Sequence, residues 1–142
     1  MEERVRAVGH ENVSARHGST FEVTTDDYLT PAGDCILGIG ADRAPADFDP
    51  TFVAACQAAD ATIALTLEVG DATQTVTGRG DPALTFESER SLVGRTSDYV
   101  DERTVVVGAD AAAADFDRTM VEALAAGRDL VLTLSVRAGR DG

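Results

Sequence analysis

Apolar and polar residues alternate between Val13 and Thr24. Val13, Phe21 and Val23 fall on one parity, and polar residues fill the other. Successive strand residues point to opposite faces, so this alternation predicts one strand over residues 13–24 with a single buried face. The stretch "CILGIGA" that begins at Cys35 is continuously apolar, which predicts a second and more deeply buried strand.

The spacing of apolar residues changes to that of a helix at "DPTFVAACQAA". Asp49 followed by Pro50 is a typical helix start, a cap and then a first-turn proline. Apolar residues at spacings of four, five and eight then mark one helical face, which we expect to be buried: Phe48, Phe52, Val53 and Cys56. The segment "ATIALTLEV" predicts a strand, and a tight turn at Gly70-Asp71 leads into a further strand, "ATQTVTG".

The chain also contains a repeat. Residues 40–58 match residues 108–126 at twelve of nineteen positions, an offset of 68 residues. Phe, Thr and Val recur in register, which a bias toward Ala and Asp does not explain. The helical face recurs as Phe116, Met120, Val121 and Leu124. We therefore predict one domain over residues 1–142, built from two copies at about 5–70 and 73–137. Each copy reads strand, strand, strand, helix, strand, so the fold is α+β, mostly β, with pseudo-two-fold symmetry.

Composition bears on the environment of the protein. The 142 residues suit one domain, and no apolar run reaches the roughly 18 residues of a membrane span. The first residues lack the pattern of a signal peptide, so we expect a cytoplasmic protein. Acidic residues number 25 against 12 arginines, without any lysine, as in proteins of salt-loving archaea. If the acidity serves hydration in concentrated salt, the net charge of -13 says little about binding partners.

The two cysteines are too few for a zinc motif. Cys56 aligns with Leu124 and is expected in the core. Cys35 aligns with Arg103, and two interpretations stay open for it. It is a packed thiol, or it lies beside the Arg103 guanidinium, which would favour the thiolate and provide a nucleophile.

The histidines are His10 and His17. On a regular strand they face opposite sides, so a shared metal ion would need an intervening bulge or turn. His17 shares the parity of Phe21, which predicts a core histidine. Gly38-Ile39-Gly40 lacks the third glycine of a dinucleotide-binding fingerprint and is interpreted as strand-to-loop geometry.

Three arginines lie among Gly, Thr, Ser and Asp: Arg79, Arg95 and Arg103. They form a salt-bridge network or an anion pocket, for which guanidinium groups are suited. The two copies differ in chemistry at Cys35 against Arg103, and at His10 against Arg79. Because packing does not require such differences, we predict that one cleft between the copies is lined by His10, Asp34, Cys35, Arg95 and Arg103.

Several motifs, in order along nearly the whole chain, resemble one family: "GHENVSARHGSTFEVT", "LTPAGDCILGIGAD", "GRGDP" and "SDYVDERTVVVGAD". It is the archaeal family of short proteins known as domain of unknown function 371. The resemblance implies a stand-alone archaeal domain with a β-sandwich-like fold and no established activity. The family pattern His-x-Thr-Thr corresponds to His17-Gly18-Ser19-Thr20, which puts in doubt a role for a threonine at position 19. The pattern Val-x-Arg-x-Ser is met by residues 93–97.

Two functional hypotheses follow. The first is a binding module for a small anionic ligand, RNA or a protein partner, with binding residues His10, Asp34, Arg79, Arg95 and Arg103. The alternative is an enzyme that uses Cys35 as nucleophile or a histidine-carboxylate metal site. No catalytic spacing is recognisable, which favours binding. The sequence names no cofactor and does not choose among these partners.

Overall fold

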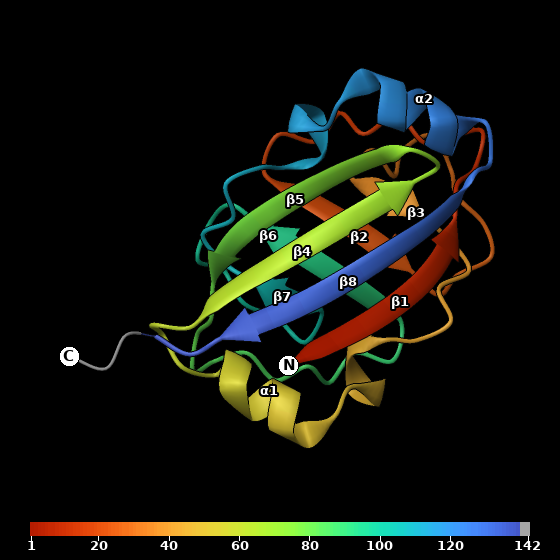
Figure 1. The fold of residues 1–142 in the computed structure, drawn as a ribbon. Helices are drawn as coiled ribbons and strands as arrows, with labels where there is room; N and C mark the ends of the chain where they lie inside the picture. Colours follow the sequence, from red (N-terminus) through yellow and green to blue (C-terminus); the bar gives the residue numbers. More distant parts are fainter. Residues whose placement is uncertain (140–142) are drawn as a thin grey trace.

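The computed structural model describes residues 1–139, and within them two four-stranded sheets pack face to face (Figure 1). The first sheet is antiparallel throughout and has the order β1 (Glu2–Val8), β8 (Asp129–Arg137), β4 (Thr62–Val69), β5 (Ala72–Arg79). The second has the order β3 (Ile36–Gly38), β2 (Thr20–Thr24), β6 (Ser91–Arg95), β7 (Thr104–Val106). Its central strands β2 and β6 run antiparallel, and each edge strand runs parallel to its neighbour. The prediction of an α+β, mostly β fold is confirmed.

The core lies between the sheets and follows from strict alternation. In β8 the inward side chains are Leu130, Leu132, Leu134 and Val136, all buried. Strand β4 places Ile63, Leu65, Leu67 and Val69 beside them. The hairpin predicted at Gly70-Asp71 joins β4 to β5, and Gly70 adopts the left-handed conformation that the turn requires, with φ of 58°.

Two short helices close the two ends of the sandwich (Figure 1). They are α1 (Pro50–Cys56) and α2 (Arg118–Ala125), each preceded by one 3₁₀ turn, at Pro45–Asp47 and Ala113–Asp115. Asp49 caps α1 by accepting a hydrogen bond from the Thr51 backbone N–H at 2.7 Å, as the sequence predicts. The predicted helical faces are buried, except that Val53 is only half-buried.

One strand prediction is wrong. Only Thr20–Thr24 of the predicted strand at residues 13–24 is a strand, and residues 9–19 form a loop. Val13 and Ala15 are nevertheless buried, so the alternation located these two core residues although the predicted conformation was wrong. Ala15 has a φ of 49°, in the left-handed region that breaks an extended chain. Strand β1 was also not predicted, because charged residues hide its pattern and the inward position of Glu3 is itself charged.

The element order of the first half recurs in the second: three strands, a 3₁₀ turn, a helix and a strand. Backbone contacts recur with it. The Gly9 N–H donates to the Arg128 carbonyl, and the Gly80 N–H donates to the Ala61 carbonyl. Gly9 thus corresponds to Gly80, whereas the predicted pairing of His10 with Arg79 implies that Gly9 corresponds to Gly78, so that pairing is out of register by two residues. These contacts support internal duplication, which stays our interpretation of the repeat.

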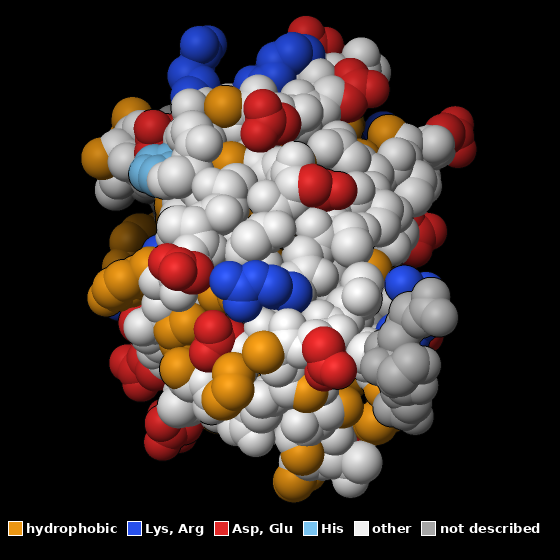
Figure 2. Space-filling view, turned by 90° about the vertical axis from the view of Figure 1, so that its left-hand side faces the viewer, with side chains coloured by type: hydrophobic (Ala, Val, Ile, Leu, Met, Phe, Trp, Pro, Cys, Tyr) orange, Lys and Arg blue, Asp and Glu red, His pale blue; other side chains and the backbone are white. Residues whose placement is uncertain are grey.

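Acidic side chains are scattered over the face shown in Figure 2 rather than gathered in one patch, with arginines between them. This distribution suits the acidic excess of the sequence, since a dispersed charge hydrates the whole surface. None of the helices within residues 1–139 has the length and apolar character needed to cross a membrane.

Candidate functional site

A polar network covers the outer side of the second sheet. Phe21, Val23 and Leu92 point into the core, so the alternate residues of β2 and β6 point outward. Several of these outward residues are polar yet buried, among them Thr24 and Ser91. Neighbouring parallel strands need a crossover connection, and residues 25–35 and 96–103 supply the two crossovers of this sheet. We attribute the burial of these polar side chains to the two crossovers.

Asp101 is the centre of the network. It lies on the second crossover and accepts hydrogen bonds from Arg95 Nη2 at 3.0 Å and from Arg103 Nη2 at 2.9 Å. The Arg103 Nε also donates to it, at 3.2 Å. Arg95 is held from a second side, because its Nε donates to Thr104 Oγ1 at 2.8 Å and its guanidinium lies 4.9 Å from the centre of the Tyr99 ring. Two guanidinium groups thus share one carboxylate.

The pKa of Asp101 shows which contacts dominate. Burial acts to raise the pKa, but hydrogen bonds and charge from Arg103, with a contribution from Arg95, outweigh it and lower the pKa to about 2. A depressed pKa adds stability that is fully present above the ordinary value near 3.8 and is lost as the pH falls toward 2. The network therefore keeps its charges across the neutral range.

Cys35 lies at the start of β3, on the same outer side. Its thiol donates a weak hydrogen bond to Glu22 Oε1, with the two atoms 3.5 Å apart. Arg103 is close enough to interact with the charges of both Glu22 and Cys35. The predicted neighbourhood of Cys35 and Arg103 is therefore present in the structure.

The predicted activation of Cys35 is not supported. Burial raises the pKa of its thiol to about 11, and the negative charges of Glu22 and Asp34 act in the same direction. A hydrogen bond with the Thr20 side chain acts in the opposite direction but does not outweigh these effects, so the thiol stays protonated at neutral pH. Asp34 is half-exposed beside Cys35, and its carbonyl accepts the backbone N–H groups of Arg16 and His17.

His17 is half-exposed at the border of this network, so the prediction of a core histidine is wrong. Its Nδ1 accepts the backbone N–H groups of Ser19 and Thr20, at 3.2 and 3.1 Å, which fixes the loop that enters β2. Ser88 does the same before β6, where its Oγ accepts the N–H groups of Arg90 and Ser91. We read the His17 ring as a structural cap rather than a ligand.

His10 and Arg79 lie elsewhere. His10 follows the end of β1, where Val8 pairs with Ile39, and Arg79 ends β5, where it pairs with Val107. Cys35 and Arg103 stand at the other ends of the same edge segments, four residues away along the chain, or about 13 Å in an extended strand. The structure thus brings together Asp34, Cys35, Arg95 and Arg103 of the predicted cleft, and leaves His10 and Arg79 apart from them.

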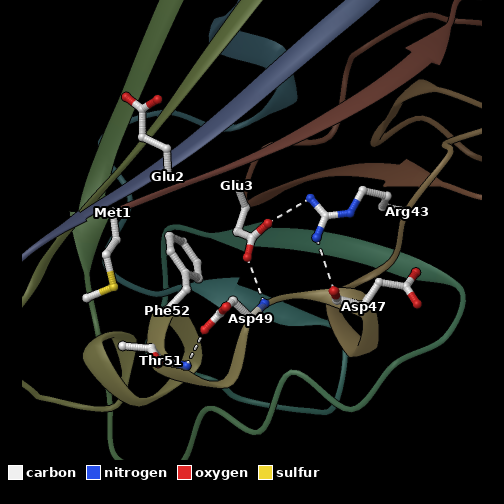
Figure 3. Close-up of a pocket in the computed structure, with 8 residues that line it drawn as sticks. All are labelled: Met1, Glu2, Glu3, Arg43, Asp47, Asp49, Thr51 and Phe52. Carbon is white, nitrogen blue, oxygen red and sulfur yellow. Dashed lines mark hydrogen bonds and ion pairs between the residues drawn. The ribbon is translucent and has the colours of Figure 1, made fainter.

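A hollow of about 600 Å³ lies between the start of β1 and the first turns of α1 (Figure 3). Glu3 points into the molecule there and is only 8% exposed. Its Oε1 lies 2.7 Å from Arg43 Nη1, and its Oε2 accepts the Asp49 backbone N–H at 2.7 Å. Arg43 also donates to the Asp47 carbonyl, as Figure 3 shows.

Both oxygens of Glu3 are therefore used to tie β1 to the segment before α1. Gln74 holds the matching position on β5 and accepts the Asp117 N–H in the same way. We interpret the Glu3 contacts as structural. Glu3 was not singled out from the sequence, although an acidic side chain at an inward strand position is a usable signal.

No group of three or more His, Cys, Asp and Glu residues within the described 139 could hold a metal ion. We take the outer network of Cys35, Arg95, Asp101 and Arg103 as the candidate site, because it gathers two guanidinium groups, a carboxylate and a thiol on one side of the second sheet. Its chemistry is that of a fixed pair of guanidinium groups beside a neutral thiol.

Comparison with known proteins gives a family without an activity. The chain matches the model of "Domain of unknown function (DUF371)" over residues 5–137. It is also 38% identical over 136 residues to an uncharacterized protein of Methanocaldococcus jannaschii, a match that spans 96% of this chain and 100% of that protein. The family resemblance seen in the sequence motifs is confirmed.

Proposed function

This chain belongs to the family of domain of unknown function 371, and we propose that it is a binding module for a small anionic ligand held by Arg95 and Arg103. The observation that carries the proposal is the sharing of Asp101 by two guanidinium groups. Both guanidinium groups are held in place by this carboxylate, and Arg103 also lies within range of the Glu22 charge, so the ligand is drawn by directed N–H donors rather than by an excess of positive charge.

The donor geometry supports an anion as ligand. A guanidinium has five N–H donors. Within residues 1–139, the Nε and Nη2 groups of both arginines are engaged, while neither Nη1 has a protein acceptor. No buried polar side-chain atom in that range lacks a partner, so each Nη1 reaches the surface. A carboxylate or phosphate oxygen is the natural acceptor for such donors.

A compact anion fits better than RNA or a protein partner. The two arginines converge on one carboxylate instead of forming the basic stripe that follows a nucleic-acid backbone. The enzyme alternative has no comparable support, since the Cys35 thiol has a raised pKa. We therefore carry only the binding proposal forward.

The working environment that we infer is a cytoplasm rich in salt. Support comes from 25 acidic residues against 12 arginines with lysine absent. In molar salt a weak surface ion pair is screened within about 3 Å, so a ligand site needs direct and preorganised donors. Arg95, fixed by Thr104 and Asp101, meets that need.

The proposal is tested by titrating inorganic phosphate into the protein in molar KCl, with amide and guanidinium NMR signals as the readout. We expect saturable shifts at Arg103 and Thr104, and at least a tenfold weaker affinity for Arg103→Gln. Arg137→Gln is the matched control, because Arg137 is an exposed arginine on the first sheet, and its affinity should stay unchanged. Shifts that do not saturate, or equal weakening by both substitutions, would contradict an anion site at Arg103.

A further inference from the structure

The two outer edges of the first sheet are protected to different degrees. Strands β1 and β5 are its edges, and each leaves alternate backbone groups pointing away from the sheet. On β1, the Arg6 N–H is bonded to Asp42 Oδ1, and on β5 the Thr77 N–H is bonded to Asp110 Oδ1. The outward groups further toward the start of each strand are therefore those of Glu2 and Arg4 on β1 and of Thr73 and Thr75 on β5.

Strand β1 is blocked at this position. The Arg43 Nη1 donates to the Arg4 carbonyl at 3.1 Å, and the strand carries the exposed charges of Glu2, Arg4 and Arg6. Charged side chains and capped carbonyls are common devices that prevent an edge strand from pairing with another chain. Ala111 replaces Arg43 in the second half, so the repeat does not supply the same block to β5.

Strand β5 is open where β1 is blocked. Thr73 and Thr75 are exposed, and their backbone N–H and C=O groups have no partner within residues 1–139. Residues 72–78 carry no charge and include three threonines, which favour a strand. Figure 1 shows β5 as the free edge of the front sheet, beside β4. An uncharged edge with unpaired backbone groups is a template for a further strand.

We propose that β5 pairs antiparallel with β5 of a second copy of this chain, so that the two first sheets form one continuous sheet. A two-fold axis at Gln74 sets Thr73 of each copy opposite Thr75 of the other. Each of these pairs exchanges two backbone hydrogen bonds, and the four bonds use all the free outward groups of the two threonines.

A second copy is the occupant that charge favours. Two chains of net charge -13 repel, so they associate best through a segment that bears no charge, and residues 72–78 are such a segment on both copies. At each end of the pair, Asp71 of one copy approaches Asp110 of the other in this register. Their repulsion is screened by salt, so dimerisation strengthens as the salt concentration rises.

The first test is the oligomeric state by sedimentation equilibrium in molar KCl, over a wide range of protein concentration. The wild type is expected to reach twice the monomer mass, with a dissociation constant that falls as KCl is raised. Thr75→Pro removes an N–H that makes no bond within the fold and is tolerated at an edge, so it should yield a folded monomer. A wild type that stays monomeric at every concentration overturns the proposal, and so does a dimer that Thr75→Pro leaves intact.

Cross-linking tests the register independently, even if Thr75→Pro fails to fold. In a Cys35→Ser background, Gln74→Cys places two cysteines at the two-fold axis, where facing Cα atoms of such a pair lie about 4.5 Å apart. Mild oxidation is expected to give a covalent dimer. Thr66→Cys is the control, because Thr66 lies on β4 in the interior of the sheet and should give none. Failure of Gln74→Cys to cross-link, or equal cross-linking of both variants, overturns pairing at this register.

Discussion

Cys35 and Arg103 show how one backbone position acquires two chemistries. Each is the last residue before an edge strand of the second sheet, and each carbonyl accepts a hydrogen bond from the neighbouring central strand, at Glu22 and Val93. Since both side chains leave the outer side of the sheet, neither is needed for the core. The arginine donates to Asp101 on its own crossover, while the thiol donates to Glu22. The same place in the backbone is therefore cationic in one half and neutral in the other.

The reactivity of Cys35 tests this electrostatic picture. Because burial and Glu22 raise the pKa of the thiol to about 11, its thiolate fraction at pH 8 is far below that of a free cysteine with a pKa of about 8.5. We expect alkylation of the folded protein at pH 8 to be at least about tenfold slower than that of free cysteine, even though a thiolate of higher pKa is the better nucleophile. The rate should climb until about pH 11, and Glu22→Gln should move this rise to lower pH.

The same pKa shift has a consequence for stability. The fold favours the protonated thiol, so its stabilising contribution is complete below the ordinary pKa of a cysteine thiol and disappears as the pH rises to about 11. Cys56, whose pKa burial raises to about 12, acts in the same direction and is too buried to be alkylated in the native state.

An alkylation rate at pH 8 equal to that of free cysteine would contradict the raised pKa of Cys35, because it would show that Arg103 outweighs burial and Glu22.

At the scale of elements, the sequence predicts best where the physics is local. Helix caps, glycine turns and the spacing of apolar residues along a helix or strand all depend on residues close in the chain. The helix start at Asp49 and the hairpin at Gly70 were predicted from such local signals. Strand β1 was missed because its inward Glu3 is stabilised by Arg43 and by the Asp49 N–H, far along the chain. The loop before β2 was read as strand because its burial alternates, although Ala15 breaks the extended chain.

The candidate site divides in the same way. Cys35 and Arg103 were linked through the repeat, whose contacts recur in the structure. Asp101, which holds the two arginines, was not singled out, because nothing local distinguishes it from the other acidic residues of this chain. His10 was included by aligning Gly9 with Gly78, whereas the structural contacts align Gly9 with Gly80. The pairing of His10 with Arg79 was therefore wrong by two residues, and both residues lie at the opposite end of the edge segments from Cys35 and Arg103.

The packing of α2 gives a prediction for this scale. Phe116, just before the helix, is 2% exposed, and its ring centre lies 5.6 Å from that of Phe21 on β2. Replacing Phe116 with Ala leaves a cavity between the helix segment and the second sheet. We expect a loss of about 3–5 kcal/mol in the free energy of unfolding, measured by denaturant titration in molar salt. Thr119→Ala, at an exposed position of α2, should change it by less than about 0.5 kcal/mol, and a similar small effect for Phe116→Ala would refute this packing.

At the scale of the molecule, the two sheets are built around their central pairs. Strands β4 and β8 are neighbours in the first sheet, and β2 and β6 in the second, so each half contributes one strand to each centre. Neither half contains a complete core, because the inward residues of β4 pack beside those of β8. The chain therefore gains its stability from burial across the halves, and the acidic charge spread over its outside opposes that compaction.

This opposition leads to the last prediction. With a net charge of -13 on a small fold, self-repulsion is strong at low ionic strength, where the Debye length reaches about 30 Å at 0.01 M, and weak at 1 M, where it is about 3 Å. We expect the midpoint of thermal unfolding to rise steeply with KCl and the protein to be largely unfolded in dilute buffer. Salt also strengthens hydrophobic burial, so a charge variant is needed to separate the two effects. Changing the exposed Glu68, Asp71 and Glu122 to their amides should raise the low-salt midpoint and flatten its dependence on KCl, whereas an unchanged slope would assign the salt effect to the core and not to charge.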